Sequence, residues 1–343
     1  MRRNIFTGFI ACILFIGTLG CAQSEGNPVI NLMIDADIAA SPSDDQGREA
    51  SDLLHTMGQQ LDARHLNATF FAPQDLIRTP ARLRMTSLGR LGFELGMSGN
   101  NSNENLSAKS LSEQKAILQE SVAFIESCRV CGKNEISVWG FMPQSFDQNE
   151  DTYKVLDQLG IQYNTGFQAG VIFAPGHESD VWPYKVKGHK FYAVPVSTYD
   201  LSGQKVPLQD KYFDDNGLTS TQWYDALVDK FNQIQGKNEP MAIILTKSVS
   251  GSGDYFDAFV NFLDFAVSKE ASFVATKDLV NMSREEAFVP AAKTSNDQTE
   301  DKPIGISIEA QGEAVAPTNA SNSSEECPTC GKNGQINASL SSQ

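Results

Sequence analysis

Two carboxylate side chains lie close together where a predicted strand ends. The apolar residues from Val29 onward predict a buried strand that closes at Asp35, and Asp37 follows on the same face of the extended backbone. A carboxylate at this position could serve as a general base, and the pair could bind a hard cation such as Ca²⁺ or Mg²⁺. Further candidate oxygen ligands for such a cation are Asp44, Asp45 and Glu94.

The loop at residues 142–146 (MPQSF) is the second place where we expect chemistry. The apolar run at residues 136–141 predicts a strand, and Pro143 disfavours helical backbone at Met142, so the strand passes into a stiff loop. In sheets of parallel strands, functional loops follow the carboxyl ends of the strands. We therefore expect this loop at the same edge of the sheet as Asp35.

A helix is predicted after this loop, because apolar residues recur at helical spacing up to Gly160. We predict that Asp147 caps its N-terminus and that Glu150 reaches back to complete a capping box. A strand at residues 161–163 then completes a β-loop-α-β unit. Parallel strands joined by a helix need cover on both faces, so the unit predicts an α/β sheet or barrel.

Strand and helix patterns alternate over the rest of the body, residues 28–286. Further strands are expected at residues 29–35, 68–72, 92–97, 191–197, 241–246 and 271–276. Helices are expected at residues 48–63, 217–235 and 255–269, and in the segments that follow residues 73 and 110. About seven strands with intervening helices predict one distorted (β/α) barrel domain.

The order of these segments resembles the polysaccharide deacetylase superfamily, whose NodB-homology domain is a (β/α) barrel. The matching motifs are ATFF (residues 68–71), GFELGMSGNNSNENLS (92–107), FMPQSFDQNEDTYKVLDQLGI (141–161), VWPY (181–184) and IILTKSVSG (243–251). The resemblance implies an enzyme that removes N- or O-acetyl groups from glycans. It also implies a divalent metal held by one Asp and two His, with a neighbouring Asp as general base.

The metal-binding residues of that family are missing here. Asp35 stands at the position of the general base, and the positions of the metal ligands hold Ala36, Ser98 and Ser102. Hydroxyl groups are poor neutral ligands for zinc, so we expect no metal cofactor and a degenerate member of the superfamily. Met142 replaces an expected arginine, and Thr246 replaces an expected histidine. The histidines of the chain lie outside these motifs: His55, His65, His177 and His189.

The groove beside these positions is expected to bind sugar through aromatic side chains. The predicted groove residues are Met142, Phe146, Trp182 and Thr246, with Trp139, Phe167 and Tyr184 as further aromatic candidates. Three functions stay open from the sequence. They are a glycan-binding pseudoenzyme, an active glycan deacetylase with an atypical carboxylate or metal-free site at Asp35, and a structural surface lipoprotein.

Two cysteine pairs share the pattern Cys-x-x-Cys-Gly-Lys-Asn, one at Cys128 and Cys131 and one at Cys327 and Cys330. Together they would form a Cys₄ zinc site if the end of the chain folded back onto the body. In an oxidising exterior each pair could form a disulfide instead. We favour disulfides or free thiols over zinc.

The first residues predict export. Two arginines precede an uncharged apolar run at residues 5–19, which is typical of a secretory signal and is short for a membrane span. Residues 18–21 (TLGC) resemble a lipoprotein cleavage box. We therefore predict that Cys21 becomes the acylated first residue, followed by a tether at residues 21–27, with release from the cell as the alternative.

The charge of the chain argues against nucleic acid as a partner. Loss of residues 1–20 removes two arginines, so the net charge of −15 becomes −17, and Lys and Arg form no clusters. The expected partner is a glycan or cell-envelope polysaccharide, and the membrane is contacted only through the lipid anchor. Residues 287–343 are rich in Ser, Asn, Thr, Glu and Ala, which predicts a disordered tail.

Overall fold

A computed structural model describes residues 27–126 and 137–286 of the chain. The strands of its main sheet are β1 (Val29–Asp35), β2 (Thr69–Ala72), β3 (Glu94–Met97), β4 (Gly140–Phe141), β5 (Tyr163–Gln168), β6 (Tyr184–Lys185), β7 (Tyr192–Val196), β10 (Met241–Thr246) and β11 (Ser272–Val274). A separate hairpin pairs β8 (Thr198–Leu201) with β9 (Gln204–Pro207).

The helices lie between these strands in the sequence. They are α1 (Asp44–Asp62), α2 (Gln74–Ile77), α3 (Arg82–Arg90), α4 (Leu111–Glu126), the 3₁₀ turn η1 (Gln144–Phe146), α5 (Glu150–Leu159), α6 (Asp210–Asp215), α7 (Ser220–Ile234), α8 (Lys247–Ser250), α9 (Gly253–Ser268) and α10 (Thr276–Glu286).

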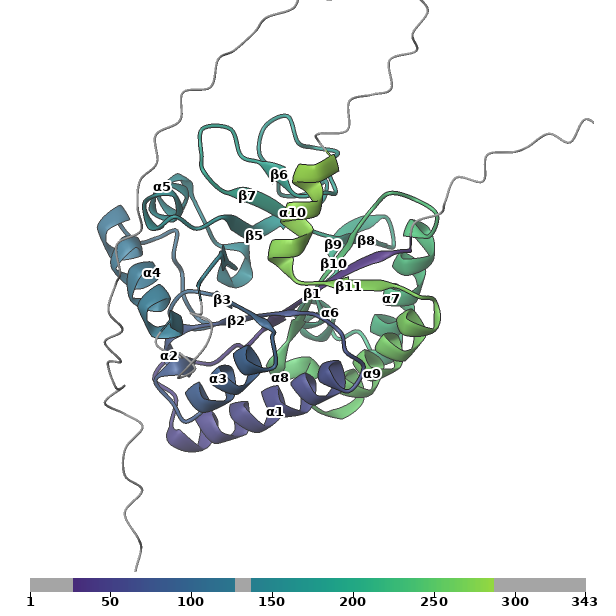
Figure 1. Ribbon diagram of the computed structural model, residues 1–343, viewed down its shortest axis with the longest axis horizontal. Coiled ribbons are helices and arrows are strands. Elements are labelled where there is room, and N and C mark those ends of the chain that lie inside the picture. Colours follow the sequence, from purple (N-terminus) through teal and green to yellow (C-terminus); the bar gives the residue numbers. More distant parts are fainter. Residues whose placement is uncertain (1–26, 127–136, 287–343) are drawn as a thin grey trace, which may run out of the picture.

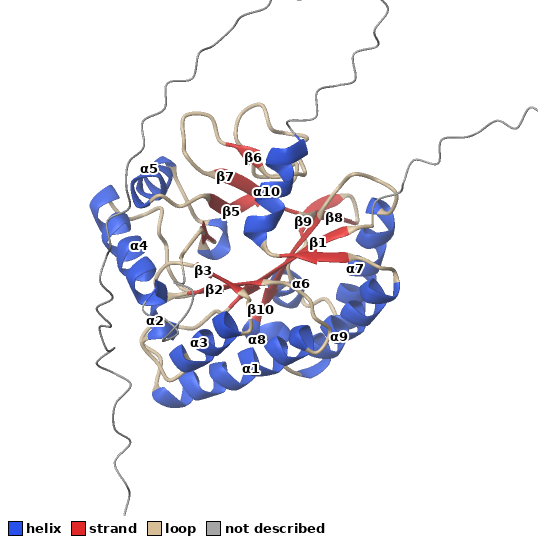
Figure 2. Cartoon of the chain, in the orientation of Figure 1, coloured by secondary structure: helices blue, strands red, loops and turns tan. Residues whose placement is uncertain are grey.

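The main sheet curls into the predicted distorted (β/α) barrel. Its strand order is β10-β1-β2-β3-β4-β5-β7-β6, and β11 pairs with the first half of β1. Neighbouring strands are parallel, except that β6 runs antiparallel to β7. Figure 2 shows helices around the outside of the strands. Parallel strands joined through helices require this arrangement, because both faces of the sheet must be covered.

Alternate residues of β1 face two different cores. Ile30, Leu32 and Ile34 pack in a large outer core between the sheet and the helices, whereas Met33 faces the interior of the barrel. Residues of the interior core come from β1, β2, β5, β7 and β10, from the loop after β4 and from α10: Met33, Phe71, Met142, Tyr163, Val194, Val196, Ala242, Ile244, Leu279 and Val280. Asp35 shares the face of Met33, so its side chain belongs to the interior.

Ser197, which follows β7, links that strand to β10. Its N–H donates to the Ala242 carbonyl at 3.0 Å, and its hydroxyl oxygen accepts from the Ala242 N–H at 3.0 Å.

The two ends of the barrel differ. Where the strands begin, α10 crosses the interior and packs Leu279 and Val280 against it (Figure 1). We call this the plugged end, and we call the opposite end, where β1, β3 and β10 finish, the mouth.

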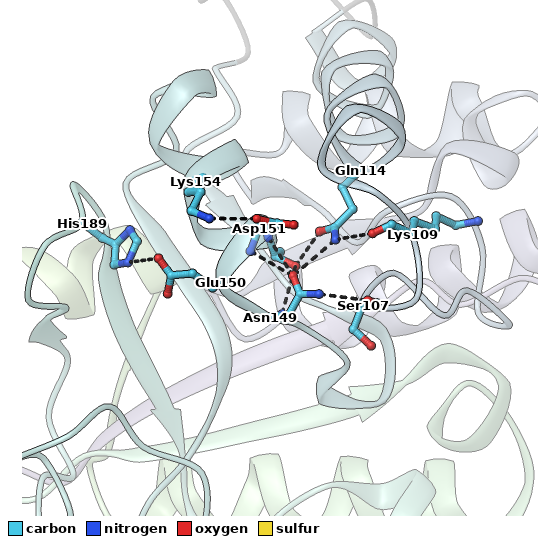
Figure 3. A network of polar contacts seen from close by, with 9 residues as sticks. Ser107, Lys109, Gln114, Asn149, Glu150, Asp151, Lys154 and His189 are labelled. Carbon is cyan, nitrogen blue, oxygen red and sulfur yellow. Dashed lines mark hydrogen bonds and ion pairs between the residues drawn. The ribbon is translucent and has the colours of Figure 1, made fainter.

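Helix α5 begins later than predicted. Asn149 is the N-cap, because its side-chain oxygen accepts from the N–H groups of Asp151 at 3.0 Å and Thr152 at 3.1 Å (Figure 3). The prediction that Asp147 caps this helix is wrong. Its carboxylate instead accepts from the Ser107 N–H at 2.9 Å and ties two loops together. Asp and Asn are equally good caps, so a tertiary contact decides between them.

Strands β1 and β10 begin and end where the sequence predicts. The apolar pattern did not predict β6, the hairpin of β8 and β9, or the helices α6, α8 and α10. Within residues 27–126 and 137–286, no helix has both the length and the apolar character needed to cross a membrane.

Candidate functional site

The mouth holds a nearly buried carboxylate that accepts a single hydrogen bond from the described part of the chain. Asp35 ends β1 and is 6% exposed, and the side-chain N–H of Gln144 donates to its Oδ1 at 3.2 Å. Burial raises the pKa of Asp35 from 3.8 to about 7, with the negative charge of Asp37 acting in the same direction. A carboxylate that titrates near neutral pH can accept a proton from water.

A lysine ammonium lies beside these carboxylates. Lys247 follows Thr246, which is paired with Asp35 in the adjacent strand β10, and it is 7% exposed. Its Nζ lies 3.8 Å from Asp37 Oδ1, and its positive charge opposes the rise in the pKa of Asp35. Asp37 is held by Ser248, whose N–H donates to Oδ1 at 3.0 Å and whose hydroxyl donates to Oδ2 at 2.7 Å. The loop after β1 is therefore fastened to α8.

A second buried carboxylate fixes the backbone that carries Lys247. Asp210 begins α6 and accepts from the Thr246 N–H at 2.9 Å and 2.8 Å, one distance to each oxygen. The Ser250 hydroxyl donates to the same carboxylate at 2.6 Å. Burial raises the pKa of Asp210 to about 7, and these hydrogen bonds oppose the rise. The end of β10 and the start of α8 are thus tied to α6.

One buried hydroxyl group at the mouth has no hydrogen-bond partner among the described residues. Ser98, directly after β3, is 1% exposed and its Oγ lacks a partner, whereas the fully buried Thr246 hydroxyl lies against the Asp210 carboxylate and lowers its pKa. An unpaired buried polar group costs about 1–3 kcal/mol, so native proteins rarely leave one without a protein or water partner. The mouth therefore has unused capacity for a polar ligand.

A groove of about 360 Å³ opens beside the mouth. Aromatic faces come from Phe146 and Tyr212, and amide groups come from Gln168, Gln204 and Gln209. Gln209 precedes Asp210, and Phe146 lies two residues after Gln144, so the groove walls continue the chain segments that hold the mouth together.

The loop that carries Phe146 has an unusual backbone. Ser145 and Phe146 have positive φ values of 51° and 60°, a region that costs energy for residues other than glycine. Gln144, just before them, is 9% exposed and bonded to Asp35. In this conformation the first and last residues of η1 have different roles: Gln144 bonds to Asp35 at the mouth, and Phe146 lies in the groove wall.

Solved structures show what this architecture is similar to. A protein of Mycobacterium smegmatis assigned as a polysaccharide deacetylase matches with a TM-score of 0.58 at 16% identity, covering 80% of this chain and 96% of that one. PuuE allantoinase matches with a TM-score of 0.60 at 13% identity, covering 79% and 94%. A Pseudomonas aeruginosa PAO1 protein assigned as a polysaccharide deacetylase gives 0.59 at 13% identity, covering 75% and 91%.

This chain has the polysaccharide deacetylase fold. The likeness to these structures concerns the fold, which confirms the architecture that the sequence motifs predicted. No protein-family model and no curated protein matches the sequence.

The residues at the metal positions of the deacetylase resemblance do not fit a divalent metal. Ala36 is fully buried in the outer core, and the Ser102 hydroxyl donates to the Ile38 carbonyl at 2.8 Å. Asp37 has both oxygens engaged and an ammonium group beside it. Among the described residues, no three His, Cys, Asp or Glu side chains are grouped to hold a metal. These positions therefore supply no ligand set for a divalent metal ion.

The other candidate cation ligands lie away from Asp35. Glu94 begins β3 at the plugged end, where it accepts from the Tyr163 hydroxyl at 2.9 Å. Asp44 and Asp45 occupy the exposed first turn of α1. These three side chains therefore do not join Asp35 and Asp37 in one cation site.

The predicted groove residues divide between the two ends of the deacetylase-like barrel. Thr246 lies at the mouth, Phe146 lines the groove, and Met142 packs in the interior core next to the loop. Trp182 lies elsewhere, because its indole N–H donates at 2.9 Å to the Asn238 carbonyl, which precedes β10 at the plugged end.

The further aromatic candidates do not reach the mouth either. Trp139 precedes β4 and borders a pocket of about 230 Å³ next to α10. Phe167 and Tyr184 are buried in the outer core, where they pack edge to face with ring centroids 6.1 Å apart. The predicted cysteine sites fall outside the described residues: Cys21, Cys128, Cys131, Cys327 and Cys330.

The sequence reasoning missed Lys247, Gln144 and Asp210. A signal for Lys247 was present, because a charged residue directly after the apolar strand β10 occupies the same kind of position as Asp35 after β1. Parallel strands in register place both residues at the same end of the barrel. Asp210 carried no such signal, since its role depends on the contact between α6 and β10.

Proposed function

We propose that this protein is an exported glycan-binding protein and that the metal-dependent deacetylation implied by the family resemblance is lost. The observation that carries the proposal is a set of buried polar groups with unused bonding capacity beside an open groove. Ser98 Oγ has no partner among the described residues, and Asp35 accepts one hydrogen bond from them. A mouth kept only for structural reasons would be filled by apolar packing or paired polar groups.

The groove has the chemistry that a sugar requires. Phe146 and Tyr212 present aromatic faces, which pack against the apolar faces of sugar rings, and three glutamine amides can pair with hydroxyl groups. Its volume of about 360 Å³ lies in the range of small-molecule sites.

The fold alone does not select a carbohydrate. An allantoinase shares it, with a TM-score of 0.60, as do proteins assigned as polysaccharide deacetylases. Function within one fold depends on the residues at the site. The glycan proposal therefore rests on the groove chemistry together with the sequence motifs.

Export and membrane attachment form the second part of the proposal. The apolar run at residues 5–19 and the TLGC sequence support a secretory signal with an acylated Cys21. In this arrangement the barrel lies on the outer side of a membrane, where its partner is a cell-envelope polysaccharide. A purely structural surface lipoprotein is the competing function, and it requires no ligand at the mouth.

Calorimetric titration of the chain without residues 1–20 tests the proposal, with soluble fragments of chitin, xylan and cellulose as probes. We expect at least one fragment to bind and Phe146→Ala to weaken its binding about tenfold or more, which corresponds to about 1.4 kcal/mol. The matched control is Phe173→Ala, since Phe173 is 38% exposed and lies outside the groove lining. Absence of binding to every fragment, or equal losses for both variants, would contradict the proposal.

A further inference from the structure

Two cationic side chains meet over one aromatic ring at the plugged end. Lys185 ends β6 and is the register partner of Tyr192 in β7, so both side chains point to the same face of the sheet. The Lys185 Nζ lies 5.0 Å from the centroid of the Tyr192 ring, and the Arg284 Cζ of α10 lies 4.5 Å from it. Figure 1 shows α10 beside β6 and β7.

This cation pair has unused hydrogen-bond donors. The Arg284 Nη1 donates to Asn281 Oδ1 at 3.5 Å, whereas the buried Arg284 Nε has no partner among the described residues. The Lys185 ammonium donates to the Lys190 carbonyl, and an ammonium group carries three N–H donors. Two like charges held close together repel each other, and an anion between them would offset that cost. The pair therefore has the chemistry of an anion site.

The surface around the pair is cationic. Lys187 and Lys190, in the turn between β6 and β7, are exposed, and so is Lys277 near the start of α10. The acidic side chains at the same end include Asp157, which is half-buried and accepts from the Lys190 N–H at 2.6 Å. We call Lys185, Lys187, Lys190, Lys277 and Arg284 the basic surface.

Large apolar side chains are exposed next to the basic surface. Trp139 is 37% exposed and lines a pocket of about 230 Å³ together with Lys277 and Asn281, the hydrogen-bond partner of Arg284. Leu91, just before β3 at the same end, is 51% exposed. Tryptophan next to lysine and arginine is typical of side chains that lie at a membrane–water interface.

The chain enters the barrel at this same end. β1 begins at Val29, and the Ser272 N–H donates to the Pro28 carbonyl at 2.8 Å, which fixes the entry point. Cys21 lies eight residues before Val29, and an extended chain spans at most about 3.5 Å per residue. An acylated Cys21 would therefore hold the plugged end within about 28 Å of the lipid.

The mouth carries the opposite charge. Helices α1, α4, α5 and α9 follow strands that end at the mouth, and the first turn of each holds at least one acidic residue. These residues are Asp44, Asp45, Glu113, Glu150, Asp151 and Asp254. An anionic lipid surface would repel the mouth and attract the plugged end, so charge alone would orient the body.

We propose that the plugged end docks on anionic phospholipid headgroups, with the basic surface binding their phosphates and Trp139 and Leu91 entering the interface. This inference rests on the proposed export and membrane attachment, and it adds a protein surface to a contact that the sequence indicated through the lipid anchor alone. The docked barrel turns its mouth and groove away from the membrane, toward a polysaccharide of the cell envelope.

Co-sedimentation of the chain without residues 1–20 with lipid vesicles tests this surface without any acyl group. The probes are vesicles of phosphatidylcholine alone and vesicles of phosphatidylcholine mixed with phosphatidylglycerol. We expect binding to the mixed vesicles, weak or no binding to phosphatidylcholine alone, and loss of binding as the salt concentration rises.

Four variants make the result specific. Arg284→Gln should weaken binding about fivefold, and the triple change Lys185→Gln, Lys187→Gln and Lys190→Gln about 100-fold, because each cation near an anionic surface contributes about fivefold. Lys154→Gln is the matched control, since Lys154 is exposed on α5 and paired with Asp151 at 2.9 Å. Vesicles with brominated acyl chains should quench the tryptophan fluorescence of the wild type, and Trp139→Phe should lose most of this quenching.

The outcomes separate this inference from the proposed function. Equal binding to both kinds of vesicle, no binding to either, or equal losses for the triple variant and Lys154→Gln would overturn the docking surface. Calorimetric binding of inorganic phosphate without any vesicle binding would also overturn it, in favour of an isolated phosphate site. None of these results changes the oligosaccharide titration, so glycan binding at the mouth stands or fails by its own test.

Discussion

Glu94 at the plugged end offers a quantitative test of how the barrel is held together. It is 6% exposed and accepts hydrogen bonds from the Thr69 hydroxyl at 2.8 Å, the Tyr163 hydroxyl at 2.9 Å and the Lys277 N–H at 3.0 Å. Thr69 in turn accepts from the N–H of Thr276, the first residue of α10, at 2.9 Å. One carboxylate therefore joins β2, β3, β5 and α10.

The change Glu94→Ala removes the acceptor of two buried hydroxyl donors, Thr69 and Tyr163, and of the partly buried Lys277 N–H. Each unsatisfied donor costs about 1–3 kcal/mol, whereas removal of a buried charge recovers part of the total, because burial raises the pKa of Glu94. We therefore expect the free energy of unfolding to fall by about 3 kcal/mol. Glu94→Gln keeps the shape and one acceptor oxygen, so a loss of about 1 kcal/mol is expected.

Urea denaturation at neutral pH, followed by tryptophan fluorescence, measures these differences. Glu113→Ala is the control, because Glu113 is an exposed residue at the start of α4 that bonds only to Ser110. Its effect should stay within about 1 kcal/mol. If Glu94→Ala unfolds within about 1 kcal/mol of the wild type, the proposed fastening of α10 is refuted.

Three further predictions concern the mouth and the chain ends. Burial raises the pKa of Asp35 and Asp210 from 3.8 to about 7, so between these values the folded state holds protons that the unfolded chain releases. The free energy of unfolding should therefore fall as pH rises from 4 to 7. Asp35→Asn should make this fall smaller when unfolding by urea is measured across that pH range. Asp37→Ala should weaken glycan binding at least about threefold by calorimetry, since α8 loses its anchor, and an unchanged affinity would argue against this role. Limited proteolysis should leave a core of residues 28–286, and a stable fragment made of the tail alone would contradict the predicted disorder.

Features of the fold that depend on local sequence pattern were predicted correctly. Continuous apolar runs gave β1 and β10 their observed bounds, because strands buried on both faces need apolar residues throughout. The motif order correctly indicated the deacetylase fold, which the matching structures confirm. Asp35 could also be placed at a strand end from the sequence alone.

The sequence-based predictions were wrong for residues whose place, at the mouth or at the plugged end, depends on which end of a strand they occupy. Glu94 and Ser98 are four residues apart, yet Glu94 begins β3 at the plugged end and Ser98 follows β3 at the mouth. Trp182 likewise lies in a loop that the motif placed near the groove, and its contact with Asn238 shows the opposite end. Asp210 reaches Thr246 through tertiary packing, which no local pattern encodes.

Hydrogen–deuterium exchange of the chain without residues 1–20, with and without a bound oligosaccharide, tests the central claim most directly because it locates the ligand. We expect slower exchange in the loop at residues 144–146, in β9 and α6, which form the groove, and at residues 246–248. The segments around Trp139 and α10, which border the pocket at the plugged end, should exchange as before. Protection confined to the plugged end, or no protection at the groove at saturating ligand, would contradict glycan binding at the mouth.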